Sequence, residues 1–332
     1  MAELVQIWRA DVQEGAHYGT AAVANDKGEI IAGWGDTDMV TYPRSSMKPF
    51  QALALVETGA ASAFGLNARH LAIACGSHRG EPMHTSLVSQ WLAQLGCTPA
   101  SLACGPHYPG HTPTAHDMIA RHEAPTPVHN NCSGKHGGFL TVCRHCGFDT
   151  EHYDAPEHPA QKLFAANLAE LGAAEPAWGI DGCTLPTPAL PVSNTAKLAA
   201  TFAACQGSPN RAAAMQALLD AMRQHPEYTS GSGHPMGQVI DATQGKVIFK
   251  IGAEGFLLAF VPEQKLGIAI KTADGADRAR VPALLAILQG LKLVDTAAMP
   301  QLLALMNPPI TDTRNQVVGS IKPAPDLLRS LN

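Results

Sequence analysis

The chain has 332 residues, which is enough to bury a large core as one big domain or as two. Hydrophobic residues make up 45% and charged residues only 15%, and the 30 glycines and 25 prolines indicate a turn-rich globular protein rather than a disordered or fibrous one. The net charge of -5 argues against binding to nucleic acid or to a membrane surface.

The first residues contain no basic segment followed by a long apolar run, so we expect neither a signal peptide nor a membrane anchor. We therefore expect a cytoplasmic protein. The eight cysteines are spread along the chain instead of crowding into a small scaffold. In a reducing compartment they are expected to be thiols or metal ligands.

Strands are predicted first, at residues 5–10, 19–24 and 29–34, with a turn between the last two. A helix is predicted from Ser45 to about Gly59, followed by a short apolar segment at 71–75 and an amphipathic helix at 81–95. Residues 97–131 are rich in proline, histidine and glycine, which predicts loops with one short helix.

The middle of the chain is predicted to be helical, and strands return after residue 245. Helices are expected at 134–146, 159–171, 194–205 and 209–224, strands at 246–251, 255–261 and 266–272, and a helix at 280–291. This order predicts an α/β fold of the α+β type, in which both ends of the chain build one antiparallel sheet. We expect a single domain over 1–332, with the sheet from about 1–40 and 245–325 and the helical region from about 45–240.

A hydroxyl and an amine lie three residues apart in the stretch Arg44-Ser45-Ser46-Met47-Lys48-Pro49, where a helix is predicted to begin. Positions three apart share one face of a helix, so Ser45 and Lys48 can meet there. A serine is a weak nucleophile until a base takes its proton, and a lysine serves as that base only in its neutral form. The ordinary alternative is that Ser45 caps the helix and Lys48 is a solvated lysine of its first turn.

Glycines open a later predicted helix, in the run Asn131-Cys132-Ser133-Gly134-Lys135-His136. Exposed amides at a helix start suit an anion or a developing negative charge. The alternative is a close helix crossing that needs glycines for packing. A phosphate-binding loop is a poor match because the Gly-Lys pair lacks the earlier glycine of that motif.

Two other stretches carry residues that are able to do chemistry. Asp181 and Cys183 lie in a predicted turn among prolines and glycines, which is either a plain rigid loop or a carrier of these two side chains. Lys271 ends a predicted strand, where a lysine is usually solvated. Cys143 and Cys146 form a C-x-x-C that we interpret as ordinary thiols, because it lies in a predicted helix without a second pair at zinc-finger spacing.

Together these stretches resemble the rhizobial-type (class 3) L-asparaginase family over nearly the whole chain. The motifs that carry the resemblance are Arg44-Ser45-x-x-Lys48-Pro49, Cys75-x-Ser77-His78, Asn131-Cys132-Ser133-Gly134-Lys135-His136, Asp181-Gly182-Cys183-x-Leu185-Pro186-Thr187-Pro188 and the strand end at Lys271. The resemblance implies a fold like that of serine β-lactamases and glutaminases, in which helices flank an antiparallel sheet and a helical region is inserted. It also implies a homodimer that hydrolyses the side-chain amide of L-asparagine to L-aspartate and ammonia.

The resemblance further implies two catalytic pairs, Ser45 with Lys48 and Ser77 with Lys271, lying close together in the fold. Neutral Lys48 would take the proton of Ser45, which would attack the amide carbon to form an acyl-enzyme. We expect Ser45 to carry the acyl group because its lysine is local. Amides near Ser77 or Ser133 are candidates for the oxyanion hole.

A zinc site formed by Cys132, Lys135 and Cys183 is also implied by the resemblance, with a fourth position for water or substrate. Thiolates suit zinc, whereas a lysine must lose its proton before it binds the metal. Because Ser-Lys chemistry does not require a metal-bound hydroxide, we expect zinc to order loops or hold substrate.

Recognition of the substrate needs partners for its α-carboxylate and its α-ammonium group. Arg44 suits the carboxylate and Asp181 suits the ammonium group because of their charges. Asn131 and His136 are further candidates for substrate binding, since they belong to the same motifs.

Two other functions stay open. The pattern Ser45-x-x-Lys48 and a late strand bearing Lys271-Thr272 are also typical of penicillin-recognising serine hydrolases. Against that function, Ala273 stands where those enzymes have glycine, and the chain contains no Ser-Asp-Asn. A non-catalytic protein that binds zinc or an amino acid is the second alternative, although the presence of both serines and both lysines favours an enzyme.

Overall fold

The computed structural model describes residues 1–329, which divide into two compact units. The first, called here the sheet unit, combines residues 1–46, residues 190–204 and the chain from 238 onward. The second, called here the helical unit, combines residues 47–189 and 205–237. The single domain expected over residues 1–332 stays a prediction.

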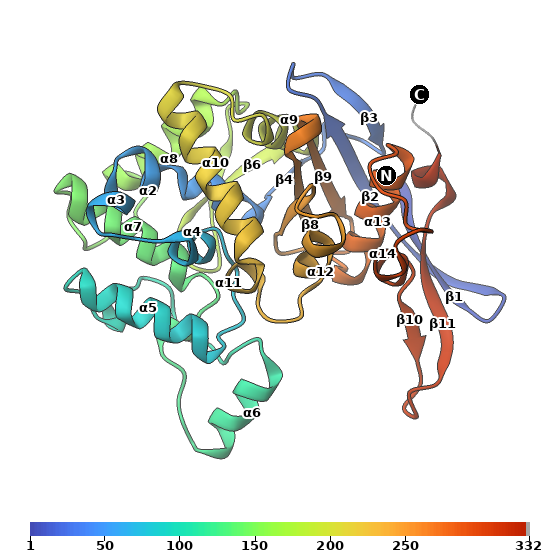
Figure 1. Cartoon of the computed structure of the whole chain (residues 1–332), viewed down its shortest axis with the longest axis horizontal. Helices are drawn as coiled ribbons and strands as arrows, with labels where there is room; N and C mark the ends of the chain where they lie inside the picture. Colours follow the sequence, from blue (N-terminus) through green and yellow to red (C-terminus); the bar gives the residue numbers. More distant parts are fainter. Residues whose placement is uncertain (330–332) are drawn as a thin grey trace. The chain divides into compact units, whose positions relative to one another are not determined.

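The sheet unit is built on one antiparallel sheet, whose strands come from both ends of the chain (Figure 1). Its strands are β1 (Ala2–Arg9), β2 (Val12–Ala24), β3 (Ile30–Trp34), β7 (Ile248–Ile251), β8 (Phe256–Val261), β9 (Leu266–Thr272), β10 (Pro309–Thr311) and β11 (Val317–Pro323). Their order is β10-β11-β1-β2-β9-β8-β7, and β3 pairs with β2. The pairing of β2 with β9, which sets Ala22 opposite Ala269, joins the two ends of the chain.

Apolar strands and two helices make the core of the sheet unit. Every residue of β8 is buried, so both faces of the sheet are covered at this strand. Helix α9 (Val192–Ala203) packs against β2, β8 and β9, while α13 (Arg280–Gly290) packs against β1, β9 and β11. The short helix α14 (Pro300–Met306) packs on α13 and buries Leu302 and Met306.

The helical unit contains most of the helices of the chain. They are α1 (Lys48–Gln51), α2 (Leu53–Glu57), α3 (Ala60–Ala63), α4 (Ala68–Ala74), α5 (Pro82–Gln94), α6 (Thr112–Ala120), α7 (Ser133–Cys146), α8 (Pro159–Glu170), α10 (Pro209–Gln224) and α11 (Pro226–Ser230), while α12 (Pro235–Ala242) crosses into the sheet unit. Helix α4 contacts α7, α10 and α11. Residues 133–143 of α7 are all buried, so this helix lies in the core of the unit.

A small sheet forms around β6 (Pro186–Pro191). Its first residues pair with β5 (Ala177–Ile180) in the helical unit, and its last two pair with β4 (Val40–Thr41) in the sheet unit. The hairpin of β5 and β6 encloses residues 181–185, which contain the predicted Asp181 and Cys183.

The structure confirms the antiparallel sheet built from both ends of the chain and the helical region inserted between them. The segment at 71–75 is the end of α4 rather than a separate element. The single helix predicted from Ser45 to Gly59 is wrong, because residues Arg44–Met47 form a 3₁₀ turn that precedes two short helices. Pro49 has no N–H to donate to the carbonyl of Ser45, which removes one hydrogen bond of a continuous α-helix there.

Within residues 1–329, none of the helices combines the length and apolarity needed to cross a membrane.

Candidate active site

Lys48 is fully buried in the helical unit and lies among three oxygen atoms. Its Nζ is 2.5 Å from the carbonyl oxygen of Gly76, 3.2 Å from that of Asn131 and 2.9 Å from Oγ of Ser77. All four residues of α1 are buried, so packing around the helix fixes the backbone from which the Lys48 side chain extends. A buried amine within hydrogen-bond distance of a serine hydroxyl is the arrangement that a Ser-Lys nucleophile requires.

All three partners of the Lys48 amine are oxygen atoms. The carbonyl oxygens of Gly76 and Asn131 only accept hydrogen bonds, so they take two N–H groups. The third partner, Ser77, has a hydroxyl that donates as well as accepts. The amine can donate to all three oxygen atoms, and the Ser77 hydroxyl is close enough to exchange a proton with it.

Ser77 is held by the turn that follows α4. Its amide donates to the carbonyl oxygen of Thr229 over 2.8 Å. At the preceding Gly76, a Cβ would lie 2.9 Å from the carbonyl oxygens of both Tyr228 and Thr229, so only glycine lets the backbone approach this closely. The close contact with α11 fixes the position of the hydroxyl relative to Lys48.

His78 forms a buried hydrogen-bonded pair with Ser133, which the sequence analysis did not predict. Its Nδ1 accepts the amide of Gly80 over 3.1 Å, so the neutral ring carries its proton on Nε2, which donates to Oγ of Ser133 over 2.8 Å. Burial, with the neighbouring His84 next in importance, holds the pKa of His78 well below its usual value. The His78 pair joins the Ser77 segment to the start of α7. The only sequence signal for this pair is that His78 and Ser133 each lie in one of the motifs that carry the family resemblance.

His84 extends this network to α11. Its Nδ1 accepts the amide of Glu81 over 3.1 Å, and its Nε2 donates to the carbonyl oxygen of Glu227 over 2.8 Å. The ring stacks on that of His78, with 4.9 Å between centroids. Burial lowers the pKa of His84 as well, so both rings are held in the neutral form.

The structure brings Cys132, Lys135 and Cys183 together in the helical unit. Nζ of Lys135 donates to Sγ of Cys183 over 2.9 Å, and the two thiols share a hydrogen bond. All three side chains are buried. Burial opposes the charge of Lys135, but the sulfur atoms of Cys132 and Cys183 raise its pKa overall. The hydrogen bond from Cys183 lowers the pKa of Cys132 well below its usual value.

This donor set fits a zinc ion. Two sulfur atoms and one nitrogen atom converge at a buried position, and zinc prefers these elements. Among residues 1–329 no three His, Cys, Asp or Glu side chains are grouped to hold a metal. The nitrogen donor beside the two sulfur atoms is the amine of Lys135. That amine must lose its proton to bind the metal.

Cys183 is presented by a tight turn between β5 and β6. The amide of Asp181 donates to the carbonyl oxygen of Leu185, and the amide of Thr184 donates to that of Asp181, both over 2.9 Å. Thr184 has a φ of 80°, which is a strained conformation for a β-branched residue. The Asp181 carboxylate is half-buried and accepts the amide of Gly182 over 2.7 Å.

Asn131 and His136, the further candidates for substrate binding, occupy different surroundings. Asn131 is exposed, and its side-chain oxygen accepts a hydrogen bond from Sγ of Cys132 over 3.2 Å. His136 is fully buried, with its Nδ1 2.6 Å from the hydroxyl of Tyr153. The substrate roles of both residues stay predictions.

Three of the predicted site residues lie in the sheet unit. Arg44 and Ser45 are half-buried in the 3₁₀ turn, and Arg44 has a left-handed φ of 55°. Lys271 lies near the end of β9, where its Nζ donates to the carbonyl oxygens of Glu254 and Thr272. Burial lowers the pKa of Lys271.

The two predicted catalytic pairs each join a residue of the sheet unit to one of the helical unit. The pairing of Ser45 with Lys48 and of Ser77 with Lys271 therefore stays a prediction. The contact of Lys48 with Ser77 lies within the helical unit, and the sequence analysis did not predict it.

Two amides proposed for the oxyanion hole are already engaged. The amide of Ser77 donates to Thr229, and that of Ser133 donates to the carbonyl oxygen of Asn130 over 3.0 Å. An oxyanion would have to use other donors near these residues.

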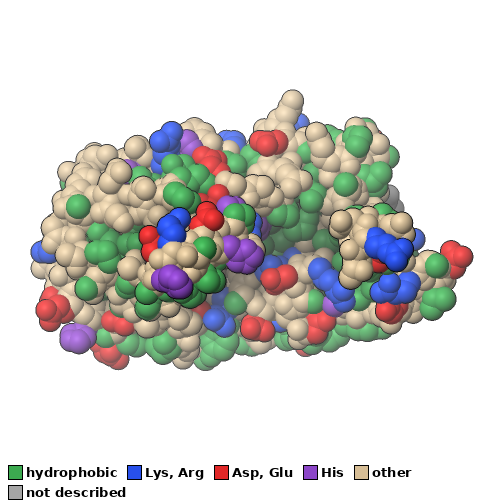
Figure 2. All heavy atoms as spheres, turned by 90° about the horizontal axis from the view of Figure 1, so that it is seen from below, with side chains coloured by type: hydrophobic (Ala, Val, Ile, Leu, Met, Phe, Trp, Pro, Cys, Tyr) green, Lys and Arg blue, Asp and Glu red, His purple; other side chains and the backbone are tan. Residues whose placement is uncertain are grey.

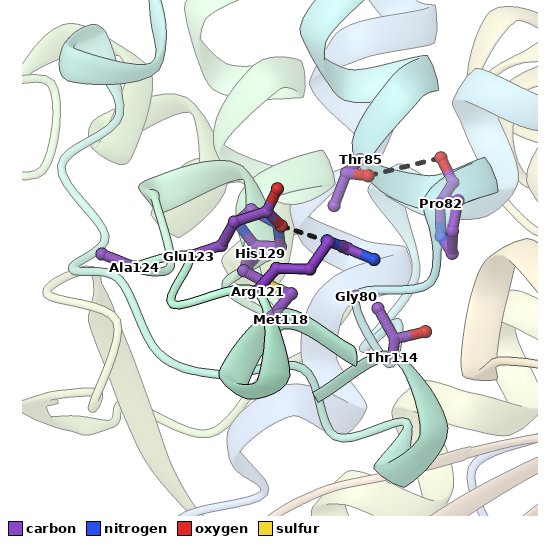
Figure 3. Close-up of a pocket in the computed structure, with 9 residues that line it drawn as sticks. All are labelled: Gly80, Pro82, Thr85, Thr114, Met118, Arg121, Glu123, Ala124 and His129. Atoms are coloured by element: carbon purple, nitrogen blue, oxygen red, sulfur yellow. Dashed lines mark hydrogen bonds and ion pairs between the residues drawn. The ribbon is translucent and has the colours of Figure 1, made fainter. Parts of the chain in front are cut away.

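A separate surface cavity of about 340 Å³ lies in the helical unit (Figure 3). Arg121 and Glu123 form an ion pair of 2.9 Å beside it, and Met118 and His129 also line it. Its rim includes Gly80, three residues after Ser77, but none of the predicted site residues lines it. We assign no function to this cavity.

A β-lactamase from Mycobacterium bovis is 17% identical, and the match covers 78% of this chain and 88% of that protein with a TM-score of 0.40. The structure of Mglu in its glutamate form is 15% identical with a TM-score of 0.40, and the match covers 83% of this chain but only 61% of Mglu. No match was found among curated proteins. The sequence model of a family described as L-asparaginase II matches residues 5–323, nearly the whole chain. The chain therefore belongs to the L-asparaginase II family, as its motifs had indicated.

Proposed function

We propose that this protein hydrolyses the side-chain amide of L-asparagine to L-aspartate and ammonia through an acyl-enzyme. Membership of the L-asparaginase II family supports an amidohydrolase. The observation that carries the mechanism is the contact of 2.9 Å between Nζ of the buried Lys48 and Oγ of Ser77. On this geometry Ser77 becomes our choice for the nucleophile in place of Ser45.

Lys48 moves the proton in both halves of the proposed reaction. Its neutral amine takes the proton of Ser77, whose oxygen attacks the amide carbon, and the proton passes to the leaving nitrogen as ammonia departs. Water then attacks the ester, Lys48 takes a proton from it, and that proton returns to Ser77 as aspartate leaves. The carbonyls of Gly76 and Asn131 keep the amine oriented through both steps.

Binding of the substrate is proposed to use the charged residues of the motifs. Asp181 would pair with the α-ammonium group and Arg44 with the α-carboxylate. Asn131 and His136 stay secondary candidates, and Lys271 stays a candidate partner of Ser77. An Asp181→Asn variant is expected to raise KM for asparagine, and an unchanged KM would remove the ammonium role.

Cys132, Lys135 and Cys183 would hold the zinc ion that the family resemblance implies. When bound, the ion would tie the turn at Cys183 to the start of α7 and offer a position to substrate. A Cys183→Ser variant is expected to lose most of its zinc when metal content is measured by mass spectrometry. A Cys143→Ser variant, which removes a free buried thiol of the same α7, should keep it. Equal zinc contents would contradict this site.

The proposed reaction is tested by measuring ammonia release from L-asparagine and L-glutamine. We expect the wild-type protein to hydrolyse asparagine and Ser77→Ala to lose more than about 10³-fold in kcat, because removal of a nucleophile has effects of this size. Lys48→Met should lose a similar factor, since it removes the proposed base of Ser77. Acid quenching during turnover should trap an aspartyl group on the peptide that contains Ser77.

The alternatives give different results in the same assay. If Ser45→Ala is inactive and Ser77→Ala retains turnover, the acyl group is on Ser45. No ammonia release from either amide by the wild-type protein would contradict the proposed function. A homodimer in the cytoplasm remains part of the proposal on the family resemblance and the composition.

A further inference from the structure

A loop on the surface of the helical unit binds both segments that position Lys48 and Ser77. We call residues 105–111 the strap. At one end, Gly105 accepts a hydrogen bond from Nδ2 of Asn130 over 2.6 Å, and Nε2 of His107 accepts the amide of Asn131 over 3.1 Å. At the other end, the strap forms two hydrogen bonds of 2.9 Å with Arg79, two residues after Ser77.

The tautomer of His107 follows from its two contacts. Its Nδ1 lies 2.7 Å from the carbonyl oxygen of Tyr108, an atom that only accepts, so Nδ1 carries the proton. The Nε2 atom is then unprotonated and accepts the N–H of Asn131. Both nitrogens of this exposed ring are therefore used by the main chain.

Histidines are common on the surface of this protein, so residue type alone does not distinguish His107 (Figure 2). His107 differs from the other histidines in the amide that it contacts. His129, His158 and His234 accept amides from residues two or three positions away, as local turn and helix caps do. His107 instead accepts an amide 24 residues away in the chain, two residues before α7 begins.

The peptide groups of Asn131 connect His107 to the proposed base. The N–H of Asn131 is held by His107, and its carbonyl oxygen accepts from Nζ of Lys48 over 3.2 Å. Because Asn131 is exposed, water can accept its N–H when His107 is removed. A mobile water molecule does not fix the orientation of the Asn131 main chain as the histidine ring does. Without His107, the carbonyl oxygen of Asn131, one of the two carbonyl partners of Lys48, would no longer be held in one position.

We infer that His107 is a positioning residue that orients the amine of Lys48 toward Ser77 through the main chain of Asn131. This inference rests on the proposed function, because it assigns His107 to the same Ser-Lys reaction. It predicts an effect on the proton transfer and little effect on substrate binding.

The kinetic test compares His107→Ala, His107→Gln and a control, His116→Ala, with the wild-type protein. His116 is an exposed histidine of α6 outside the strap. We expect His107→Ala to lower kcat about tenfold with KM nearly unchanged, because a small misplacement of a catalytic group acts on kcat. His107→Gln should recover most of kcat, since its side-chain oxygen can reach the position of Nε2. The control should match the wild-type protein.

Amide hydrogen exchange of Asn131 supplies a readout that does not depend on activity. Exchange at Asn131 should become faster in His107→Ala and return toward the wild-type rate in His107→Gln. Unchanged exchange, or a wild-type kcat in His107→Ala while Ser77→Ala is inactive, would overturn the inference and leave the proposed function intact. A wild-type protein that releases no ammonia would overturn the proposed function first, and with it the positioning role of His107.

Discussion

Replacing Gly134 by alanine tests whether α4 and α7 must lie in close contact for the site to form. A Cβ at Gly134 would stand 2.5 Å from the carbonyl oxygen of Ile73 and 2.9 Å from its carbonyl carbon. Ordinary contact begins at 3.4 Å, so the two backbones reach it only when they separate by 3.4 − 2.5 = 0.9 Å. Neither clashing atom belongs to a flexible side-chain end that is free to turn away.

The expected cost combines packing and helix propensity. Overpacking of a well-packed core costs about 1–3 kcal/mol, and alanine recovers up to about 1 kcal/mol relative to glycine within a helix. We therefore expect Gly134→Ala to lower the free energy of unfolding by about 1–2 kcal/mol. Helix α4 leads into Gly76 and Ser77, while Asn131 lies just before α7, so the separation also moves the carbonyl partners of Lys48 apart. A displacement near 1 Å predicts a loss of up to about 10²-fold in kcat.

Gly138→Ala on the same helix is the matched control. Its Cβ would meet Cδ2 of Leu55 at 3.6 Å and Cβ of Ala74 at 3.7 Å, which are ordinary contacts. This variant should be unchanged or more stable by up to about 1 kcal/mol, with wild-type kcat. Urea unfolding followed by circular dichroism and ammonia release from asparagine measure the two effects. If Gly134→Ala matched Gly138→Ala in both assays, the reasoning about close contact would be refuted.

Two further predictions concern stability. The pKa values of His78 and His84 lie below the 6.5 of an unperturbed histidine, so below pH 6.5 the unfolded chain binds more protons and the free energy of unfolding falls with decreasing pH. His84→Gln should reduce that slope by up to about 1.4 kcal/mol per pH unit, measured from urea midpoints across the acid range, and an identical slope would contradict the prediction. Arg211→Lys should cost about 1–2 kcal/mol, because Arg211 makes two hydrogen bonds of 2.5 and 3.2 Å to the largely buried Glu57, which a lysine cannot reproduce. Arg223→Lys, in a more exposed ion pair, should change stability by less than about 0.5 kcal/mol, and equal losses in both variants would count against this ranking.

Local patterns in the sequence predicted much of the fold. Apolar runs and turn residues located β1, β2, β3, β7, β8 and β9 of the large sheet but not β10 or β11, and helical periodicity located α5, α7, α8, α10 and α13. The short strands β5 and β6 were missed because prolines at 186, 188 and 191 suppress the signal of a strand. The break between α1 and α2 was not predicted because the apolar run from Phe50 to Val56, interrupted only by Gln51, continues across it.

The motifs also identified which residues belong to the candidate site, since Lys48, Ser77 and Asn131 all lie within them. Periodicity predicts contact between positions three or four apart, and it therefore predicts Ser45 as the partner of Lys48. The contacts that Lys48 makes in the structure reach Ser77, 29 residues away, and Asn131, 83 residues away. The sequence by itself determined the residue types and the order of the elements that carry them. Only the tertiary structure decided which oxygen atoms surround the amine, because those distances depend on how closely α4, α7 and α11 pack rather than on any local pattern.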